Sequence, residues 1–229
     1  MRQTEKNGIW EFWGDAVPGV FFFIMYITFF RLLESRFYSR EEMWLIHAPL
    51  DDFIPFSEIF IIPYLLWFGF VFLTFAWLYL YDREGYQNAC LFMFTGMSVF
   101  LIVSALIPNG LNLRPAVMPR DNVFTHLTAM LYRGDTSTNV FPSIHVYNSM
   151  ACAFAAVNTR TLNNHRIWRF FWIVMATLVI LSTTFLKQHS VMDVSAALLM
   201  SMLVYIYVYR KNEVAAHVPA GHLGRVDFS

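Results

Sequence analysis

Six long apolar runs separate short segments that carry nearly all of the charge in this chain. The runs are residues 16–30, 59–81, 85–113, 140–159, 170–186 and 194–209. A helix that crosses a bilayer needs about 20 mostly apolar residues, and a flanking side chain such as Arg31 can extend a shorter run toward the headgroups. A soluble helix would show one polar face, and residues 64–81 show none. The pattern therefore predicts an all-α polytopic membrane protein with six transmembrane helices.

The amino-acid composition supports this class and excludes others. Of the 229 residues, 57% are hydrophobic and 14% are charged, whereas soluble domains carry about 25% charged residues. Sixteen Lys and Arg residues balance sixteen Asp and Glu residues, so we expect no nucleic-acid partner. Cys90 and Cys152 lie in apolar runs, and we expect them to be buried thiols outside any disulfide.

A single integral membrane domain is expected over residues 1–229. No internal repeat is visible, and no cleavable signal peptide is expected, because the segment before the first run is acidic and aromatic. Residues 1–15 and 35–52 are amphipathic and are expected at the membrane interface. The tail from Val214 onward is expected to be flexible.

The distribution of basic residues favours one orientation in the membrane. With six spans, both ends of the chain share one side, which would hold nine Lys and Arg residues against seven on the other side. Basic residues accumulate in cytoplasmic loops. We therefore expect cytoplasmic termini, in a protein of the plasma (inner) membrane.

Several ionisable residues lie at the ends of the third to sixth runs, where charge is costly and indicates function. They are Arg114, His145, Lys187, His189 and Asp193. The third run ends on the side from which the fourth begins, and the fifth and sixth runs meet on that same side. All of these residues are therefore expected at one membrane face, which the basic-residue count makes the outer face.

The spacing of these residues favours a phosphoryl-transfer site. His189 and Asp193 are four residues apart and would share one helix face. The carboxylate could then hold one ring nitrogen and leave the other as a nucleophile. Pro142 is suited to the first turn of a helix, which would bring Ser143 and backbone amides to an anion. Two histidines, two cations and a helix start together favour a site with a nucleophile, a general acid and a charge clamp.

A metal site and an ion pathway are the alternatives to this site. Two histidines and an aspartate can bind a metal, but Arg114 and Lys187 would repel a divalent cation, so we expect no metal and no cofactor. Those two cations would instead stabilise the charge on a phosphoryl group. A channel or transporter would need polar residues deep in several spans, and the centres of the runs are apolar.

Three short motifs resemble those of the type 2 phosphatidic acid phosphatase superfamily. They are "RP" at Arg114, "PSIH" ending at His145 and "HSVMD" from His189 to Asp193, within residues 108–193. Members of that superfamily are six-helix membrane enzymes, or related soluble acid phosphatases and haloperoxidases, and they act without a metal through a phosphohistidine. The resemblance implies that His189 is the nucleophile, that Asp193 orients it and that His145 protonates the leaving group. It also implies that Arg114 and Ser143 bind phosphate.

The motifs depart from the family pattern at three positions. Ile107 stands where the family has a lysine, and Thr183 stands where it has an arginine after Ser182. Two phosphate-binding cations are therefore missing, and Lys187 is expected to replace one of them. Ile144 stands where the second motif usually has glycine. "PSIH" with "KQH" resembles the inositol phosphorylceramide synthase-like branch, which includes transferases.

The resemblance implies a metal-independent lipid phosphatase that draws a membrane lipid phosphate or pyrophosphate from the bilayer. The alternative is a lipid phosphotransferase that passes a phospholipid or sphingolipid headgroup to an alcohol, as inositol phosphorylceramide or sphingomyelin synthases do. Some polar residues have two open interpretations, headgroup contact or an ordinary surface position. They are Arg31, Glu58, Arg120, His126, Arg133 and Asp135.

Overall fold

Helices make up most of the computed structural model, which describes residues 2–36, 42–163 and 165–210. The α-helices are α1 (Arg2–Glu34), α2 (Ile61–Tyr81), α3 (Arg83–Leu106), α4 (Val123–Gly134), α5 (Ile144–Asn158), α6 (Arg166–Phe185) and α7 (Val191–Tyr205). The smaller elements are β1 (Trp44–Leu45), β2 (Asn109–Gly110), η1 (Pro49–Asp52), η2 (Glu58–Phe60), η3 (Arg160–Leu162) and the π-helical η4 (Ile206–Arg210). The prediction of a helical fold is confirmed, and the parallel pair β1–β2 is a small addition to it.

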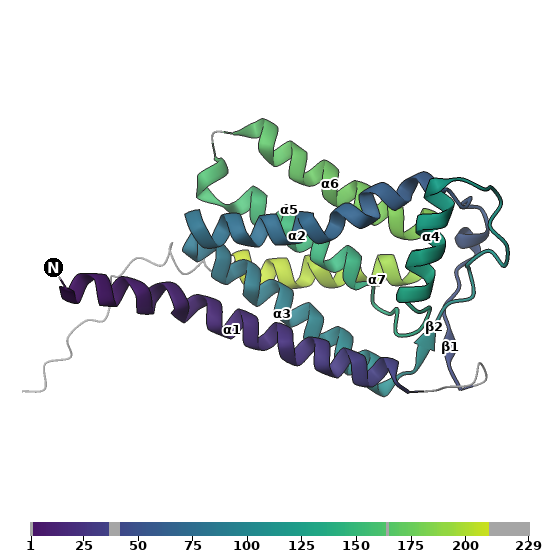
Figure 1. The fold of residues 1–229 in the computed structure, drawn as a ribbon, viewed down its shortest axis with the longest axis horizontal. Helices are drawn as coiled ribbons and strands as arrows, with labels where there is room; N and C mark the ends of the chain where they lie inside the picture. Colours follow the sequence, from purple (N-terminus) through teal and green to yellow (C-terminus); the bar gives the residue numbers. More distant parts are fainter. Residues whose placement is uncertain (1, 37–41, 164, 211–229) are drawn as a thin grey trace, which may run out of the picture.

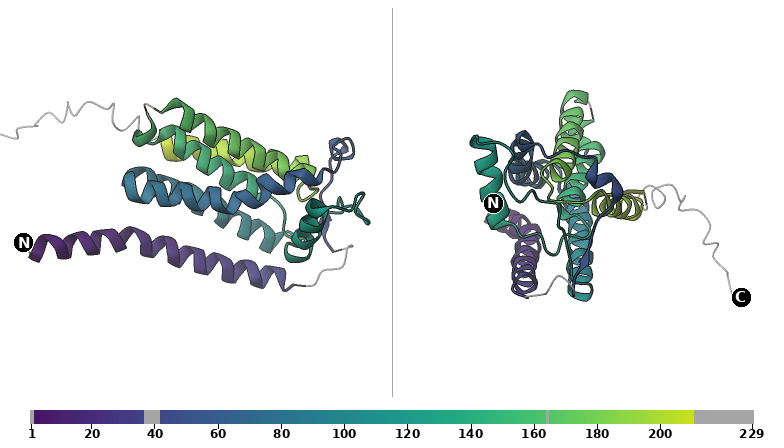
Figure 2. Two further views of the ribbon diagram at one scale, coloured as in Figure 1. Left: turned by 45° about the horizontal axis from the view of Figure 1, so that its top comes forward. Right: turned by 90° about the vertical axis from the view of Figure 1, so that its right-hand side faces the viewer.

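The long helices form an elongated bundle with polar elements gathered at one end. α2, α3, α5, α6 and α7 pack together, and α1 lies along α3 (Figure 1). α4 and the β1–β2 pair lie at the end opposite the start of α1 (Figures 1 and 2). We call this end, with the turn between α6 and α7, the α4 end. α7 runs away from it, so the start of α1 and the end of α7 lie at the opposite end (Figure 1).

Among the described residues, five segments are long and apolar enough to cross a membrane. They are Ala16–Glu34, Glu58–Tyr81, Arg83–Leu106, Arg166–Phe185 and Val191–Arg210. The predicted sixth span, residues 140–159, is not confirmed. Its helix α5 has only 15 residues, or about 22 Å at 1.5 Å per residue, against about 30 Å of hydrocarbon. The helix is short because Ser143 caps it at one end and Thr159 ends it at the other.

Although α5 is short, it links the two ends of the bundle. It packs against α2, α3, α6 and α7, and small residues such as Ala151 and Ala155 allow this close approach. Beyond its last residue, the hydroxyl of Thr159 donates to Asp82 in the turn between α2 and α3. The chain therefore alternates direction as the sequence predicted, and the residues around His145 and His189 meet at the α4 end.

The structure describes parts of the two segments that are expected at the membrane interface. Residues 2–15 are the first part of α1. Residues 42–52 form β1 and η1, whereas residues 37–41 and the tail from Val214 lie outside the described residues. Neither cysteine forms a disulfide, and Cys152 is buried while Cys90 is half-buried.

Candidate active site

The α4 end brings His145 and His189 into contact. Nδ1 of His145 lies 3.2 Å from Nε2 of His189. Nδ1 of His189 lies 2.7 Å from Oδ2 of Asp193, and His189 and Asp193 are both buried. The three side chains therefore form a continuous polar chain from a carboxylate through two imidazole rings.

The start of α7 holds His189 and Asp193 in this arrangement. Ser190 is the N-cap of α7, and its hydroxyl accepts from the backbone N–H of Met192 at 3.1 Å. His189 therefore lies just before the helix, not on it as the sequence analysis expected, while Asp193 lies in the first turn. The four-residue spacing still joins the two side chains across the N-cap, with Nδ1 of His189 2.7 Å from Oδ2 of Asp193.

Ser143 places the start of α5 beside the histidines. Its hydroxyl accepts from the backbone N–H of Val146 at 3.3 Å and caps the helix. Its own N–H donates to the carbonyl oxygen of Asp193 at 3.3 Å, which joins α5 to α7. Pro142 precedes the cap and is not in the first turn, contrary to expectation. The positive end of the α5 dipole thus lies next to His145.

Arg114 lies between β2 and α4 and is anchored to the last turn of α4 and the loop that follows it. Its Nη1 donates to the carbonyl oxygen of Tyr132 at 3.2 Å, and its Nη2 donates to those of Asp135 at 2.8 Å and Thr136 at 3.0 Å. Nη2 also donates to Oε1 of Gln188, the neighbour of His189. Nε is buried and has no partner among the described residues. Burial lowers the pKa of Arg114, and the Asp135 carboxylate opposes that shift.

This set of residues lies in a region that is similar to a known family. Residues 108–215 match the PAP2 superfamily. Neither curated proteins nor solved structures gave a match. The PAP2 superfamily consists generally of phosphoryl-transfer and hydrolase enzymes, and the match includes every predicted site residue. The inositol phosphorylceramide synthase-like branch is not confirmed.

Lys187 lies in the PAP2-matched turn between α6 and α7, but its ammonium group is engaged elsewhere. Nζ donates to the carbonyl oxygens of Asp51 at 2.7 Å and Ile54 at 2.5 Å. Its backbone has φ of 54°, a left-handed conformation that reverses the chain before His189. Burial lowers the pKa of Lys187. An ammonium group has three N–H donors, so one remains, and phosphate binding by Lys187 stays a prediction.

Two departures from the PAP2 motifs have structural explanations. Thr183 is fully buried, and its hydroxyl donates to the carbonyl oxygen of Ile180 at 2.8 Å within α6. Ile144 packs against the cluster that contains Val146 and Tyr147. The hydroxyl of Thr183 is therefore bonded within α6. The side chain of Ile144, which is next to His145 in the sequence, packs in the hydrophobic core.

Sequence reasoning missed a tyrosine on α2 that contacts His145. The hydroxyl of Tyr64 lies 3.0 Å from Nε2 of His145 and donates to Oδ2 of Asp135 at 2.8 Å. Nε2 of Gln188 donates to the same Oδ2 at 3.4 Å. The Trp67 ring, one turn along α2, lies 4.5 Å from the His145 ring between centroids. A tyrosine in an apolar run gives no signal that separates it from a packing residue.

Three of the other polar residues named from the sequence, Glu58, Arg120 and His126, make polar contacts at the α4 end. Arg120 donates to both carboxylate oxygens of Glu58 at 2.6 Å, and Asn122 donates to Oε1 at 3.0 Å. His126 lies 2.9 Å from Asp121, and both are exposed. These pairs favour a role in fastening the loop before α4, and no headgroup contact is assigned to them.

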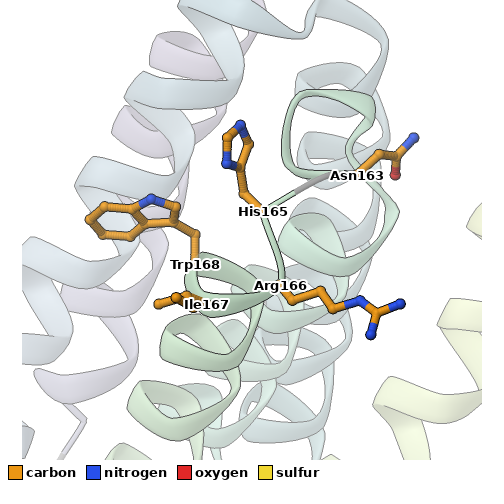
Figure 3. Close-up of a pocket in the computed structure, with 5 residues that line it drawn as sticks. All are labelled: Asn163, His165, Arg166, Ile167 and Trp168. Atoms are coloured by element: carbon orange, nitrogen blue, oxygen red, sulfur yellow. The ribbon is translucent and has the colours of Figure 1, made fainter.

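A cavity lies away from His145 and His189. It has a volume of about 570 Å³ and is lined by Asn163, His165, Arg166, Ile167 and Trp168 at the start of α6 (Figure 3). The start of α6 is at the end opposite α4 (Figure 1), so this cavity is not part of the candidate site. Within the described ranges, no group of three His, Cys, Asp or Glu residues could hold a metal ion, and metal independence stays a prediction.

Proposed function

We propose that this chain is an integral membrane enzyme of the PAP2 type that hydrolyses a lipid phosphate or pyrophosphate through a phosphohistidine. The observation that carries the proposal is the chain Asp193–His189–His145, with Nδ1 of His189 on the carboxylate and Nε2 directed at the second ring. This arrangement matches a nucleophile whose tautomer is fixed by a carboxylate. The five long apolar segments support a location in a membrane.

In the first half of the reaction, Nε2 of His189 attacks phosphorus. A bond forms between Nε2 and phosphorus while the bond to the lipid oxygen breaks. The leaving oxygen takes a proton from His145, which becomes neutral. Asp193 keeps Nδ1–H of His189 hydrogen-bonded and stabilises the positive charge that develops on that ring.

In the second half, water attacks the phosphohistidine. His145, now neutral, accepts a proton from the water as the phosphorus–nitrogen bond breaks. Phosphate leaves, and both rings return to their starting protonation. The cycle needs no other co-reactant, and the same base would serve an alcohol if an alcohol took the place of water.

The contact between the two rings must open when substrate binds. Reacting atoms in a productive complex lie about 3–3.5 Å apart, and an acid lies about 2.6–3.2 Å from the oxygen that it protonates. A phosphoryl group between the rings therefore needs more than the 3.2 Å that separates Nδ1 of His145 from Nε2 of His189.

Phosphate binding is assigned to Arg114, Ser143 and Lys187. The unpartnered Nε of Arg114 supplies a donor, and the start of α5 at Ser143 supplies a positive helix end. Lys187 supplies positive charge close in the sequence to His189, the proposed nucleophile. Together they would stabilise the charge of the five-coordinate transition state without a metal ion.

A membrane location supports a lipid substrate. A lipid can keep its chains in the bilayer while its phosphate reaches the α4 end. We propose the plasma (inner) membrane, with the α4 end facing outward and the ends of the chain in the cytoplasm, from the excess of basic residues at the opposite end.

A lipid panel tests the proposal. Purified protein is given phosphatidic acid, phosphatidylglycerol phosphate or a polyprenyl pyrophosphate, each with and without diacylglycerol, inositol or ceramide. We expect free phosphate to equal substrate loss in every case. Substrate loss that requires an alcohol and yields a new phospholipid would identify a phosphotransferase, and no turnover of any lipid phosphate would contradict the proposal.

A further inference from the structure

His145 is held from two sides, and only one side belongs to the motifs already discussed. Its Nδ1 faces His189, whereas its Nε2 faces the hydroxyl of Tyr64 at 3.0 Å. Tyr64 in turn donates to Asp135 at 2.8 Å. Tyr64 is almost fully buried and lies outside residues 108–215, so the family match assigns it nothing.

The protons available to the hydrogen bonds from Asp135 through Tyr64 to the two histidines determine the protonation state of each ring. A tyrosine hydroxyl has one proton, and in this structure that proton is directed at Asp135. The oxygen of Tyr64 is therefore an acceptor toward Nε2 of His145, which must carry a proton. With Nε2–H fixed, Nδ1 of His145 is the atom that gains or loses the second proton.

The same count applies to His189. Its Nδ1–H donates to the Asp193 carboxylate, so its Nε2 has a lone pair when the ring is neutral. Two lone pairs would otherwise meet across 3.2 Å, and the contact requires one shared proton. Before substrate binds, this shared proton would put one positive charge on the pair of rings. Burial and the neighbouring His189 lower the pKa of His145 to about 4, while the charge of Asp135 opposes that shift, so the positive charge is lost readily as the pH rises.

We propose that Tyr64 and Asp135 are positioning residues that fix the tautomer of His145, so that Nδ1 delivers the proton to the leaving group. The proposal rests on the phosphatase function above and deepens it. Asp193 orients the nucleophile, and Tyr64 with Asp135 orients the acid in the corresponding way. When the rings separate around a phosphoryl group, the shared proton stays on Nδ1 of His145, which points at the reacting centre.

Nitrogen NMR of substrate-free protein labelled at histidine tests the tautomer without any need for turnover. Signals are assigned with His145→Asn and His189→Asn variants. In the unsubstituted protein we expect a proton on Nε2 of His145 and a proton shared between Nδ1 and Nε2 of His189. In Tyr64→Phe we expect His145 to become a mixture of tautomers. A proton on Nδ1 and a bare Nε2 in the unsubstituted protein would overturn the proposal.

Kinetics provide the second test. Removing the hydrogen-bond partner of a metal-bound histidine costs about 10–100-fold in activity. For Tyr64→Phe we expect a comparable loss in kcat, with KM nearly unchanged. Without Tyr64 the charged form of His145 is less stable, so the loss of activity at high pH should begin at lower pH. Asp135→Asn should shift the profile in the same direction while retaining a hydrogen-bond acceptor.

Tyr147→Phe is the matched control. Tyr147 lies on the same helix as His145, is buried, and donates its hydroxyl proton to the carbonyl oxygen of Phe92 at 2.7 Å. It does not contact either histidine, so we expect unchanged tautomers and an unchanged pH profile. Equal effects in Tyr64→Phe and Tyr147→Phe would show a merely structural role. If no lipid phosphate is turned over at all, the proposed function fails, while the NMR result still decides the tautomer.

Discussion

The carboxylate of Asp51 accepts a hydrogen bond from the hydroxyl of Ser190 at 2.5 Å, although 139 residues separate them in the chain. Its other oxygen accepts from the backbone N–H of Val191 at 2.8 Å, and Ala48 N–H donates to Asp51 at 2.8 Å. Asp51 is buried. The loop before α2 therefore holds the start of α7 in place. The turn just before that start carries His189, the proposed nucleophile.

Replacing Asp51 with Ala should destabilise the protein and reduce turnover. A hydrogen bond to a charged group contributes about 1.5–3 kcal/mol, and the N–H of Val191 and the hydroxyl of Ser190 would lose their partner. Thermal unfolding in detergent measures the stability. Asp52→Ala is the control, because Asp52 is exposed and pairs with the exposed His47. Equal stability of the two variants would contradict this account of Asp51.

Arg114→Lys should lower kcat/KM on lipid phosphate by about 10²–10³-fold, the usual cost of one lost donor to a developing oxyanion. Lysine keeps the charge but cannot hold three carbonyl oxygens and a phosphate at once. Steady-state kinetics of the purified variant measure the loss. Turnover close to that of the unsubstituted protein would remove Arg114 from the phosphate site.

Lys187→Met should raise KM and also lower the unfolding temperature. Its ammonium group already holds the carbonyl oxygens of Asp51 and Ile54, and the remaining N–H is assigned to phosphate. The two measurements separate these tasks. A lower unfolding temperature with unchanged KM would show that Lys187 only fastens the loop.

The sequence was sufficient for the histidine pair but not for its surroundings. Alternating helix direction and the motif spacing brought His145 and His189 to one end, because both depend on local sequence and on chain order. Tyr64 and Asp51 act through partners on distant segments, and such pairings are visible only in three dimensions. The sixth span is not confirmed, because hydropathy over residues 140–159 does not show that α5 begins only after the Ser143 cap.

Activity should survive an excess of chelator and should be inhibited by vanadate, which mimics five-coordinate phosphorus. Arg114, Lys187 and the start of α5 are assigned the positive charge that a metal would otherwise supply. Phosphate release is measured with and without chelator. Loss of activity that a divalent cation restores would favour a metallohydrolase.

The orientation can be tested with two exposed positions at opposite ends of the bundle. Val117 is 82% exposed in the loop before α4, and Ile167 is 83% exposed at the start of α6. In a protein with Cys90 and Cys152 replaced by alanine, Val117→Cys should react with an impermeant thiol reagent in intact cells. Ile167→Cys should react only after permeabilisation. The reverse pattern would invert the proposed topology.

Trapping of the covalent intermediate tests the central claim most directly. Protein mixed with a lipid whose phosphate is radiolabelled is quenched in base, and the labelled peptide is mapped. We predict label on His189 that is stable in base and lost in acid, no label and no turnover in His189→Ala, and normal labelling in His165→Ala, a histidine at the far end of the bundle. Ordinary turnover in His189→Ala would contradict the account.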